Sequence, residues 1–377
     1  MTKKVEAKKV EAKADPTNKK ILQLEAENIA LKDDRTRYKQ AYEAAQRDNS
    51  VFVALADEAR QLIKPIKPLA GCPKFKLVEK KITETLCLHL TDEHADELVL
   101  PHQVGNLERV TFPIMLRRAE TYVDTVIKFA LQTLSNYDFH EVYILAHGDH
   151  TSGEIHKSVD HSYYRNMFDN CYGIGQMHAL MYRDLAAYFP QIHVVYVPGN
   201  HGRRSIKKDY NNPTDNWDYL VARIAESYCQ DLKNVDFLIP DSFSVNLDIE
   251  GHGFHVAHGD DIKSWSGIPW YGIERKTRRL TALNSSMDKR IDYYCFGHFH
   301  NIATQSALNG ETLLNGTWVA TTPYVYNSLS SYSEPSQLVH GVHKDHGISW
   351  RLNVKLRSDR EHLGPKRYGT ILKDRKY

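Results

Sequence analysis

Five apolar stretches of this chain each end in Asp, Asn or His, and this repetition constrains the fold more than any other feature. One of them is a β-branched and aromatic run that stops at Pro198-Gly199 and is followed by Asn200 and His201. A short apolar run closed by a turn signal is typical of a buried strand. The other four stretches are residues 88–94, 142–149, 254–260 and 293–300. Five buried strands that end in polar side chains indicate one shared site at the strand ends.

The composition excludes several classes of protein. The formal net charge of +2 favours no polyanionic partner for the chain as a whole, so any such partner must depend on local clusters. The five cysteines are scattered without a C-x-x-C pair, which favours free thiols in a reducing compartment. The sequence shows no signal peptide, and no apolar run approaches the roughly 18 residues of a membrane span. We therefore expect a cytoplasmic protein without a membrane partner.

The first 68 residues differ from the rest of the chain in composition and in hydrophobic pattern. Residues 1–19 are a charged near-repeat and are expected to form a disordered tail. Residues 20–68 are expected to form a helical segment and a linker that ends in two prolines. The helix carries a heptad at Ile21, Leu24, Asn28 and Leu31, which continues less well through Arg35, Tyr38, Tyr42 and Ala45. A coiled coil that forms a homo-oligomer and an amphipathic helix lying on the main domain both remain open.

The main domain is expected over residues 69–358, followed by a basic polar tail over 359–377. Strands predicted over 82–91, 140–149 and 191–198 alternate with helices predicted over 113–136, 175–188 and 217–229, the last capped by Asp215. Short strands dominate later, and a hairpin is predicted over 338–342 and 348–356. This pattern is typical of a layered α/β protein with parallel strands in the first half and antiparallel strands in the second.

The polar residues at the strand ends form a donor set for metal ions. Its members are Asp92, His94, Asp149, Asn200, His258, His298 and His300. Carboxylates, imidazoles and a carboxamide suit Mn²⁺, Fe²⁺ or Zn²⁺, and the absence of Cys argues against a structural zinc site. Asp92 and His94 are two residues apart, so on an extended segment both side chains point to the same side. Seven donors exceed the needs of one four-coordinate ion, whereas two ions that share a carboxylate would use them all.

Five motifs in a fixed order carry a resemblance to a known family. They are D-x-H at 92–94, GD at 148–149, GNH at 199–201, HG at 258–259 and GHxH at 297–300. The stretch from about residue 85 to 319 thereby resembles the calcineurin-like metallophosphoesterases. This resemblance implies an α/β fold, a four-layer α/β/β/α sandwich of two mixed sheets with a dinuclear metal site at the strand ends.

The resemblance also implies a role for each motif residue. Asp92, His94 and His300 would hold the first metal, Asn200, His258 and His298 the second, and Asp149 would bridge the two. The ions are expected to be Mn²⁺, with Fe²⁺, Zn²⁺ or Mg²⁺ as alternatives. A hydroxide that bridges them would attack phosphorus in line, because such a centre stabilises both the attacking and the departing oxygen.

His201 resembles the family's catalytic imidazole, which hydrogen-bonds the scissile phosphate. The acidic residue that often follows the GNH motif is replaced here by Gly202 and Arg203. Another carboxylate, such as Asp96 or Asp209, is therefore expected to orient His201. Residues 150–153 lack the second aspartate and the arginine typical of the phosphoprotein-phosphatase branch, which disfavours a protein phosphatase.

Basic residues next to two of the motifs bear on the substrate. Arg203 is a candidate to hold a phosphate oxygen, with Arg204 as its substitute, because a guanidinium group can donate two parallel hydrogen bonds. A second cluster includes Arg275 and Arg278. The two clusters form either a track for a phosphate backbone or merely a solvated helix face.

Three functions follow from these observations. The first is a metal-dependent nuclease, which the similarity to the double-strand-break-repair nucleases of this family favours. The second is a small-molecule phosphatase or cyclic-nucleotide phosphodiesterase, in which the same arginines would form a compact pocket. The third is a coiled-coil scaffold with a vestigial metal site, which the complete set of seven ligands disfavours.

Overall fold

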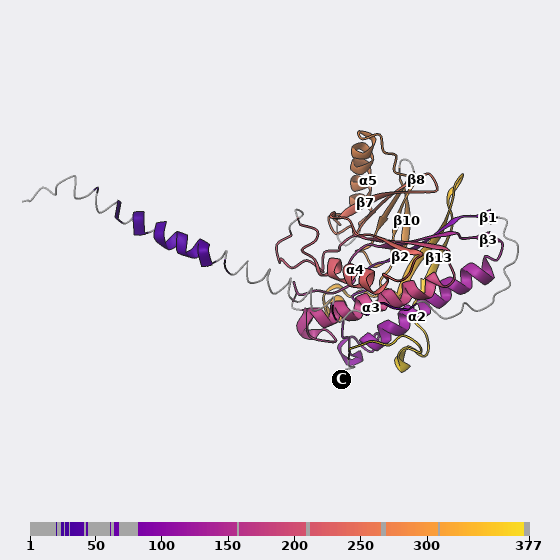
Figure 1. The fold of residues 1–377 in the computed structure, drawn as a ribbon, viewed down its shortest axis with the longest axis horizontal. Helices are drawn as coiled ribbons and strands as arrows, with labels where there is room; N and C mark the ends of the chain where they lie inside the picture. Colours follow the sequence, from indigo (N-terminus) through magenta and orange to yellow (C-terminus); the bar gives the residue numbers. More distant parts are fainter. Residues whose placement is uncertain are drawn as a thin grey trace, which may run out of the picture. The chain divides into compact units, whose positions relative to one another are not determined.

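Figure 1 shows the computed structural model of the chain, which describes residues 20, 24–25, 27–29, 31–40, 43, 61, 64–67, 82–156, 158–208, 212–264, 269–307 and 310–372. The chain divides into two compact units, Met1–Leu62 and Ile63–Tyr377. In the first unit the described residues are helical, and Leu24, Leu31 and Tyr38 of the heptad are exposed. The tail predicted over 1–19 and the heptad positions Ile21, Tyr42 and Ala45 lie outside the described residues. The coiled coil stays a prediction.

A six-stranded sheet carries three of the five motif-bearing strand ends. Its strands, in spatial order, are β13 (Gly347–Lys355), β12 (Ser336–His343), β2 (Thr85–Leu90), β4 (Glu141–Ala146), β5 (Gln191–Tyr196) and β6 (Val235–Leu238). The last four pair in parallel, and the predicted hairpin β12–β13 joins β2 antiparallel. Because parallel strands run in one direction, the loops after β2, β4 and β5 meet at one edge of the sheet. A two-stranded parallel ladder of β1 (Ile82–Thr83) and β3 (Tyr137–Asp138) directly precedes β2 and β4 in the chain.

A five-stranded sheet carries the other two motifs. Its order is β10 (Ala303–Ala307), β11 (Gly310–Leu314), β9 (Tyr293–Phe296), β8 (His252–Ala257) and β7 (Ser244–Ile249). The prediction of antiparallel strands in the second half is wrong for the three central strands, because β8, β9 and β11 pair in parallel. Parallel neighbours need a crossover connection. Helix α5 (Trp270–Ser285) lies between β8 and β9 in the chain and forms this crossover. It was not predicted, because only one of its three buried residues, Ile273, Thr277 and Asn284, is apolar.

The two sheets pack face to face and helices cover their outer faces, as Figure 1 shows. The layer between the sheets contains Cys87, Leu145 and Val195 from one sheet and Phe254, Val256 and Cys295 from the other. On the outer side of the five-stranded sheet, Ile273 of α5 packs against a second cluster with Tyr294 and Phe296. Alternate residues of each strand thus face the two layers. The predicted α/β fold, a four-layer α/β/β/α sandwich of two mixed sheets, is confirmed.

Helices α2 (Phe112–Lys128), α3 (Met167–Ala186) and α4 (Trp217–Tyr228) lie together over the six-stranded sheet (Figure 1). Helix α3 begins at Met167 rather than at the predicted residue 175. Gly173 is a weak helix former and suggests a helix boundary in the sequence. A Cβ atom at this position would lie 2.8 Å from the Phe112 ring, so the glycine permits close packing of α2 on α3. Helix α4 was predicted, but its cap is Asn216 rather than Asp215.

The segment after residue 359, expected from its composition to be a basic polar tail, packs against α2 and α3. The carboxylate of Glu361 lies 3.0 Å from the buried Arg118 guanidinium. The carboxylate of Glu120 accepts hydrogen bonds from the backbone of Lys366 and Tyr368, and the Tyr368 ring is buried. Ion pairs of this kind leave no apolar periodicity in the sequence.

Two expectations from composition can be compared with the structure. Among the described residues, no helix combines the length and the apolar character needed to cross a membrane. Cys87, Cys171, Cys229 and Cys295 are buried free thiols, as expected, whereas Cys72 lies outside the described residues.

Candidate metal centre

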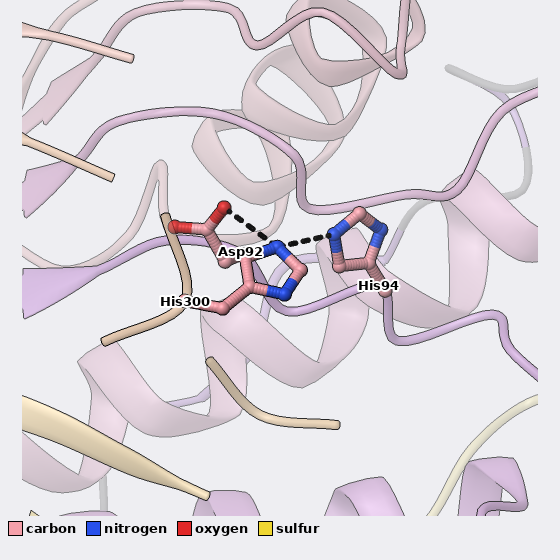
Figure 2. Close-up of side chains that lie close together, drawn as sticks. All are labelled: Asp92, His94 and His300. Carbon is pink, nitrogen blue, oxygen red and sulfur yellow. Dashed lines mark hydrogen bonds and ion pairs between the residues drawn. The ribbon is translucent and has the colours of Figure 1, made fainter. Parts of the chain in front are cut away.

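The first group of donors comes from the loops after β2 and β9. Asp92, His94 and His300 each offer one ligand atom, and these three atoms lie within 4.8 Å of one another. The His300 Nε2 atom is 3.2 Å from Asp92 Oδ1 and 3.4 Å from His94 Nε2. Figure 2 shows this imidazole between the carboxylate and the other ring. Three donor atoms that converge on one point form a candidate cation site.

The second group comes from the loops after β4, β5, β8 and β9. Asp149, His258 and His298 place their ligand atoms within 4.8 Å of one another. The His258 Nε2 atom is 2.9 Å from Asp149 Oδ2 and 3.1 Å from Asn200 Oδ1. The amide oxygen therefore joins the same group.

The two groups adjoin through Asp149. His94, which belongs to the first group, forms a further cluster with Asp149 and His201, again within 4.8 Å. The structure thus brings together all seven candidate ligands named from the sequence. A carboxylate oxygen of Asp149 lies within 4.8 Å of donor atoms from both groups, which is the position that a bridging carboxylate needs.

The backbone reaches this arrangement through left-handed conformations. Five of the seven ligands have positive φ angles: Asp92 (51°), His94 (43°), Asp149 (54°), His298 (67°) and His300 (57°). The expectation that Asp92 and His94 converge because their segment is extended is therefore wrong; tight turns after the strands bring the side chains together. Non-glycine residues in this region cost about 1–3 kcal/mol each and cluster at functional sites.

The loops that carry the ligands also fit closely against one another. The Asp92 carboxylate accepts the His298 backbone N–H at 2.9 and 3.0 Å and the Thr91 hydroxyl at 3.0 Å. A Cβ atom at position 297 would collide with this carboxylate, so the glycine of the GHxH motif is required by the close approach of the two loops. The orientation of Asp92 is fixed before any ion binds.

Neighbouring groups fix the rings of two histidine ligands. The Nδ1 atom of His258 is 3.0 Å from the carbonyl oxygen of His147. The Nδ1 atom of His94 is 3.2 Å from the Ser152 hydroxyl, which donates to the Glu97 carboxylate. Partners of this kind hold a proton on each Nδ1 and direct Nε2 toward the position of an ion.

Asp218 supports two ligand loops and was not found from the sequence. Its buried carboxylate accepts the backbone N–H groups of Asp149 and Gly199, both at 2.9 Å. It also accepts those of His150 and Thr151 at 3.1 and 3.3 Å. One side chain at the start of α4 therefore holds the GD and GNH loops in register. The only sequence signal for Asp218 is its position in the first turn of a predicted helix.

Glu93, between two ligands, is the centre of a second buried network that the sequence did not reveal. Its Oε2 atom is 2.5 Å from His150 Nδ1 and 2.7 Å from His178 Nε2. His178 in turn bonds the Tyr196 hydroxyl at 2.6 Å. Burial would raise the pKa of the Glu93 carboxyl, but His178 and His150 lower it to about 2. The network ties the D-x-H loop to α3 and to the end of β5.

His201 faces the centre but is not oriented by a carboxylate directly. Its Nδ1 atom is 3.3 Å from the Ser152 carbonyl oxygen. Asp96 accepts the Ser152 backbone N–H at 2.7 Å, so this predicted partner acts through the backbone, whereas Asp209 lies outside the described residues. The exposed His156 ring, missed in the sequence, lies 5.7 Å from the His201 ring.

Of the two arginines after the GNH motif, Arg203 lines a cleft that begins at Asn200 and also contains Lys207 and Lys208. The Arg203 guanidinium donates to the carbonyl oxygens of Asn200 and Ser205 at 2.6 and 3.1 Å. Arg203 therefore orders the loop that carries two site residues, a role that was not predicted. Arg204 pairs with Asp215 at 3.0 Å.

Arg275 and Arg278 lie on the exposed side of α5. Arg278 pairs with Glu274 one helical turn earlier, at 2.6 Å. Nothing in the described part of the chain links either residue to the seven ligands. Of the aromatic residues near them, Trp270 and Tyr271 are exposed, and Trp265 lies outside the described residues.

The electrostatics of the two groups fit divalent cations. Burial would raise the pKa of Asp149, but His258 and His201 lower it well below its ordinary value. Burial would lower the pKa of His258, but the Asp149 charge and hydrogen bond raise it to about 10. A proton on His258 Nε2 thus occupies the place between carboxylate and amide oxygen, and a bound ion must displace it. Burial lowers the pKa of His94 to about 3, which leaves that ring neutral and able to bind an ion.

Comparisons with known proteins give structural matches alone. No family model and no curated protein matches the sequence. Vps29 of Entamoeba histolytica complexed with Zn²⁺ has 12% identity and a TM-score of 0.31, over 72% of this chain and 100% of that chain. A novel archaeal phosphodiesterase has 9% identity and a TM-score of 0.32, over 71% and 99%. A Streptococcus pneumoniae protein described as a predicted phosphoesterase has 8% identity and a TM-score of 0.28, over 72% and 99%. Matches at this level assign no activity or ligand to this chain.

The five motifs occur in the order of the family, and each follows a strand of one of two packed mixed sheets. Their side chains converge into two adjoining groups of donors. This arrangement is the one that the resemblance to the calcineurin-like metallophosphoesterases implies.

Proposed function

We propose that this chain is a metal-dependent phosphodiesterase that cleaves nucleic acid. The observation that carries the proposal is the pair of adjoining donor groups around Asp149, one with Asp92, His94 and His300 and one with Asn200, His258 and His298. When bound there, two divalent ions supply Lewis-acid stabilisation of the entering and departing oxygens of a displacement at phosphorus. Mn²⁺ suits this set of oxygen and nitrogen donors, and Fe²⁺, Zn²⁺ and Mg²⁺ are alternatives.

The protein's own groups position the substrate and move a proton. The Nδ1–H group of His201 donates to the Ser152 carbonyl oxygen, which leaves Nε2 free on the other edge of the ring. His201 lies beside His94 and Asp149, with its backbone N–H on Asp149 Oδ1 at 2.7 Å. When the ring is an imidazolium, with a proton on both nitrogens, its Nε2–H group donates to the scissile phosphate and then passes its proton to the departing oxygen, which leaves the neutral Nδ1–H ring.

The cleft beside Asn200 favours a phosphodiester with further phosphates. Arg203, Lys207 and Lys208 line it, and Lys208 pairs with Asp260 two residues after the ligand His258. Cations in a groove next to a phosphoryl-transfer site attract the neighbouring phosphates of a polynucleotide. The same cations could also hold a small phosphoester, which supports a small-molecule phosphatase or cyclic-nucleotide phosphodiesterase as the second candidate.

The test is hydrolysis by the full chain with Mn²⁺ and with excess chelator. We expect turnover of bis(p-nitrophenyl) phosphate and of a single-stranded oligonucleotide, and loss of both with chelator. Turnover of monoesters or cyclic nucleotides alone would establish the second candidate. A metal-loaded chain that hydrolyses none of these substrates would refute the proposal and leave a scaffold with a vestigial site.

A further inference from the structure

The segment Thr321–Tyr332, here called the aromatic loop, exposes large apolar side chains that the metal centre does not use. Tyr324 is 67% exposed, Leu329 58%, Tyr332 42% and Tyr326 37%. The loop contains a π-helical turn, Val325–Leu329, and ends it with Ser330 at a φ angle of 49°. A group of exposed aromatic rings on one short segment marks an interaction site.

Both ends of the aromatic loop are tied to the loops that carry the first donor group. Before it, the Thr317 hydroxyl and the Trp318 backbone N–H donate to the Asp92 carbonyl oxygen, both at 3.0 Å. After it, the Ser333 hydroxyl lies 3.3 Å from Asn301 Oδ1, and Asn301 follows the ligand His300. The aromatic loop therefore begins and ends beside Asp92 and His300.

Contacts within the protein hold the Tyr332 ring in place. Arg357 lies over the Tyr332 ring at 5.8 Å and donates to its hydroxyl at 3.0 Å. Arg357 is itself fixed by the Leu107 carbonyl oxygen at 2.9 Å and by the buried Glu108 at 3.0 Å. A ring fixed in advance loses little entropy when a planar ligand stacks on it.

The basic cleft lies at the other donor group. It begins at Asn200 and contains Asp260, two residues after His258, whereas the aromatic loop adjoins Asp92 and His300. The cationic cleft thus adjoins one donor group, and the aromatic loop adjoins the other. A phosphoester without a base would use the first surface alone, but a nucleic acid strand offers phosphates to one and a base to the other.

We propose that the aromatic loop stacks an unpaired nucleobase next to the scissile phosphate, so that the substrate is single-stranded nucleic acid. A paired base is stacked within its duplex and cannot present its face to a tyrosine. This inference rests on the proposed phosphodiesterase function and names the substrate class of the same site.

The test compares Tyr324→Ala and Tyr332→Ala with Tyr324→Phe and Tyr332→Phe, which keep the ring. With Mn²⁺ and a single-stranded oligonucleotide, each alanine variant should lower kcat/KM about tenfold, mainly through KM, and each phenylalanine variant should stay near wild type. Removal of the flanking base from the substrate should slow the wild type equally. The tyrosine ring and the base form one contact, and removing either partner abolishes it. The alanine variants should therefore show nearly the same kcat/KM on the abasic strand as on the intact strand.

The results that would overturn the stacking inference differ from those that would refute the proposed function. Alanine variants that cleave the intact strand like wild type, or an abasic effect that multiplies with theirs, would overturn the stacking inference. A wild type that hydrolyses bis(p-nitrophenyl) phosphate but no oligonucleotide would also overturn it, while the phosphodiesterase activity would stand. A wild type that hydrolyses neither would refute the proposed function as well. The affinity for a fluorescent oligonucleotide, measured with chelator present so that no cleavage occurs, should rank the variants in the same order as kcat/KM.

Discussion

The Asp149→Asn variant is expected to lose at least about a thousand-fold in kcat/KM for bis(p-nitrophenyl) phosphate, the largest effect of any single change. Asp149 contacts members of both donor groups, and its two oxygens are already divided between His258 and the His201 backbone. The amide keeps the shape and one oxygen but removes the charge that two cations would share. Initial rates at saturating Mn²⁺ measure the loss.

Asp236→Asn is the matched control. Its carboxylate is 57% exposed and bonds His193 on the adjacent strand β5. Its kcat/KM should stay within about twofold, because surface changes away from a site have small effects. Thermal melts of both variants near that of wild type would exclude unfolding. An Asp149→Asn variant with more than a tenth of wild-type activity would contradict a shared carboxylate.

His201→Gln is expected to lower kcat about a hundred- to ten-thousand-fold, because general acid catalysis contributes effects of this size. The loss should depend on the departing group. A p-nitrophenolate ion departs without a proton, whereas the sugar oxygen of a dinucleotide needs one. The loss should therefore be much greater for a dinucleotide than for bis(p-nitrophenyl) phosphate, as steady-state rates on both substrates will show.

His156→Gln tests whether any imidazole near the site has this effect. Its ring is exposed and lies 5.7 Å from the His201 ring, and its kcat should change only a few-fold. Equal losses on the two substrates for His201→Gln would contradict a proton-donating role. Loss of a bound ion in that variant would instead make His201 a ligand, because its ring nitrogen lies within 4.8 Å of His94 and Asp149 donors.

The sequence predicted the strand ends well for a physical reason. Buried parallel strands are continuous apolar runs, so their ends are visible wherever Asp149 or Asn200 interrupts them. The strands β2, β4, β5, β8 and β9 all lie where these runs predicted them. The set of seven candidate ligands followed from the same signal.

The geometry that brings the ligands together was less visible. Asp92 and His94 looked like neighbours on an extended segment, but both adopt left-handed conformations that only tertiary contacts enforce. Asp218 and Glu93 support the centre through partners 19 to 85 residues away, for example Asp218 to Gly199 and Glu93 to His178. Contacts between such distant residues leave no periodic pattern in a single sequence.

Polar segments that turned out to be ordered share one property. Helix α5 and the segment after residue 359 bury few apolar side chains and depend on ion pairs such as Lys276 with Asp261 and Arg367 with Asp184. Their composition therefore resembles that of solvated chain. The aromatic loop was not singled out from the sequence, because the exposure of its tyrosines is visible only in the structure.

The number of ions that the metal-free chain binds tests the two-group centre most directly. After equilibration with Mn²⁺ and removal of free metal, elemental analysis by mass spectrometry gives ions per chain. The two donor groups predict two ions for wild type and one each for His300→Ala and His258→Ala. A wild type that binds no ion, or variants that bind as many ions as wild type, would contradict this centre.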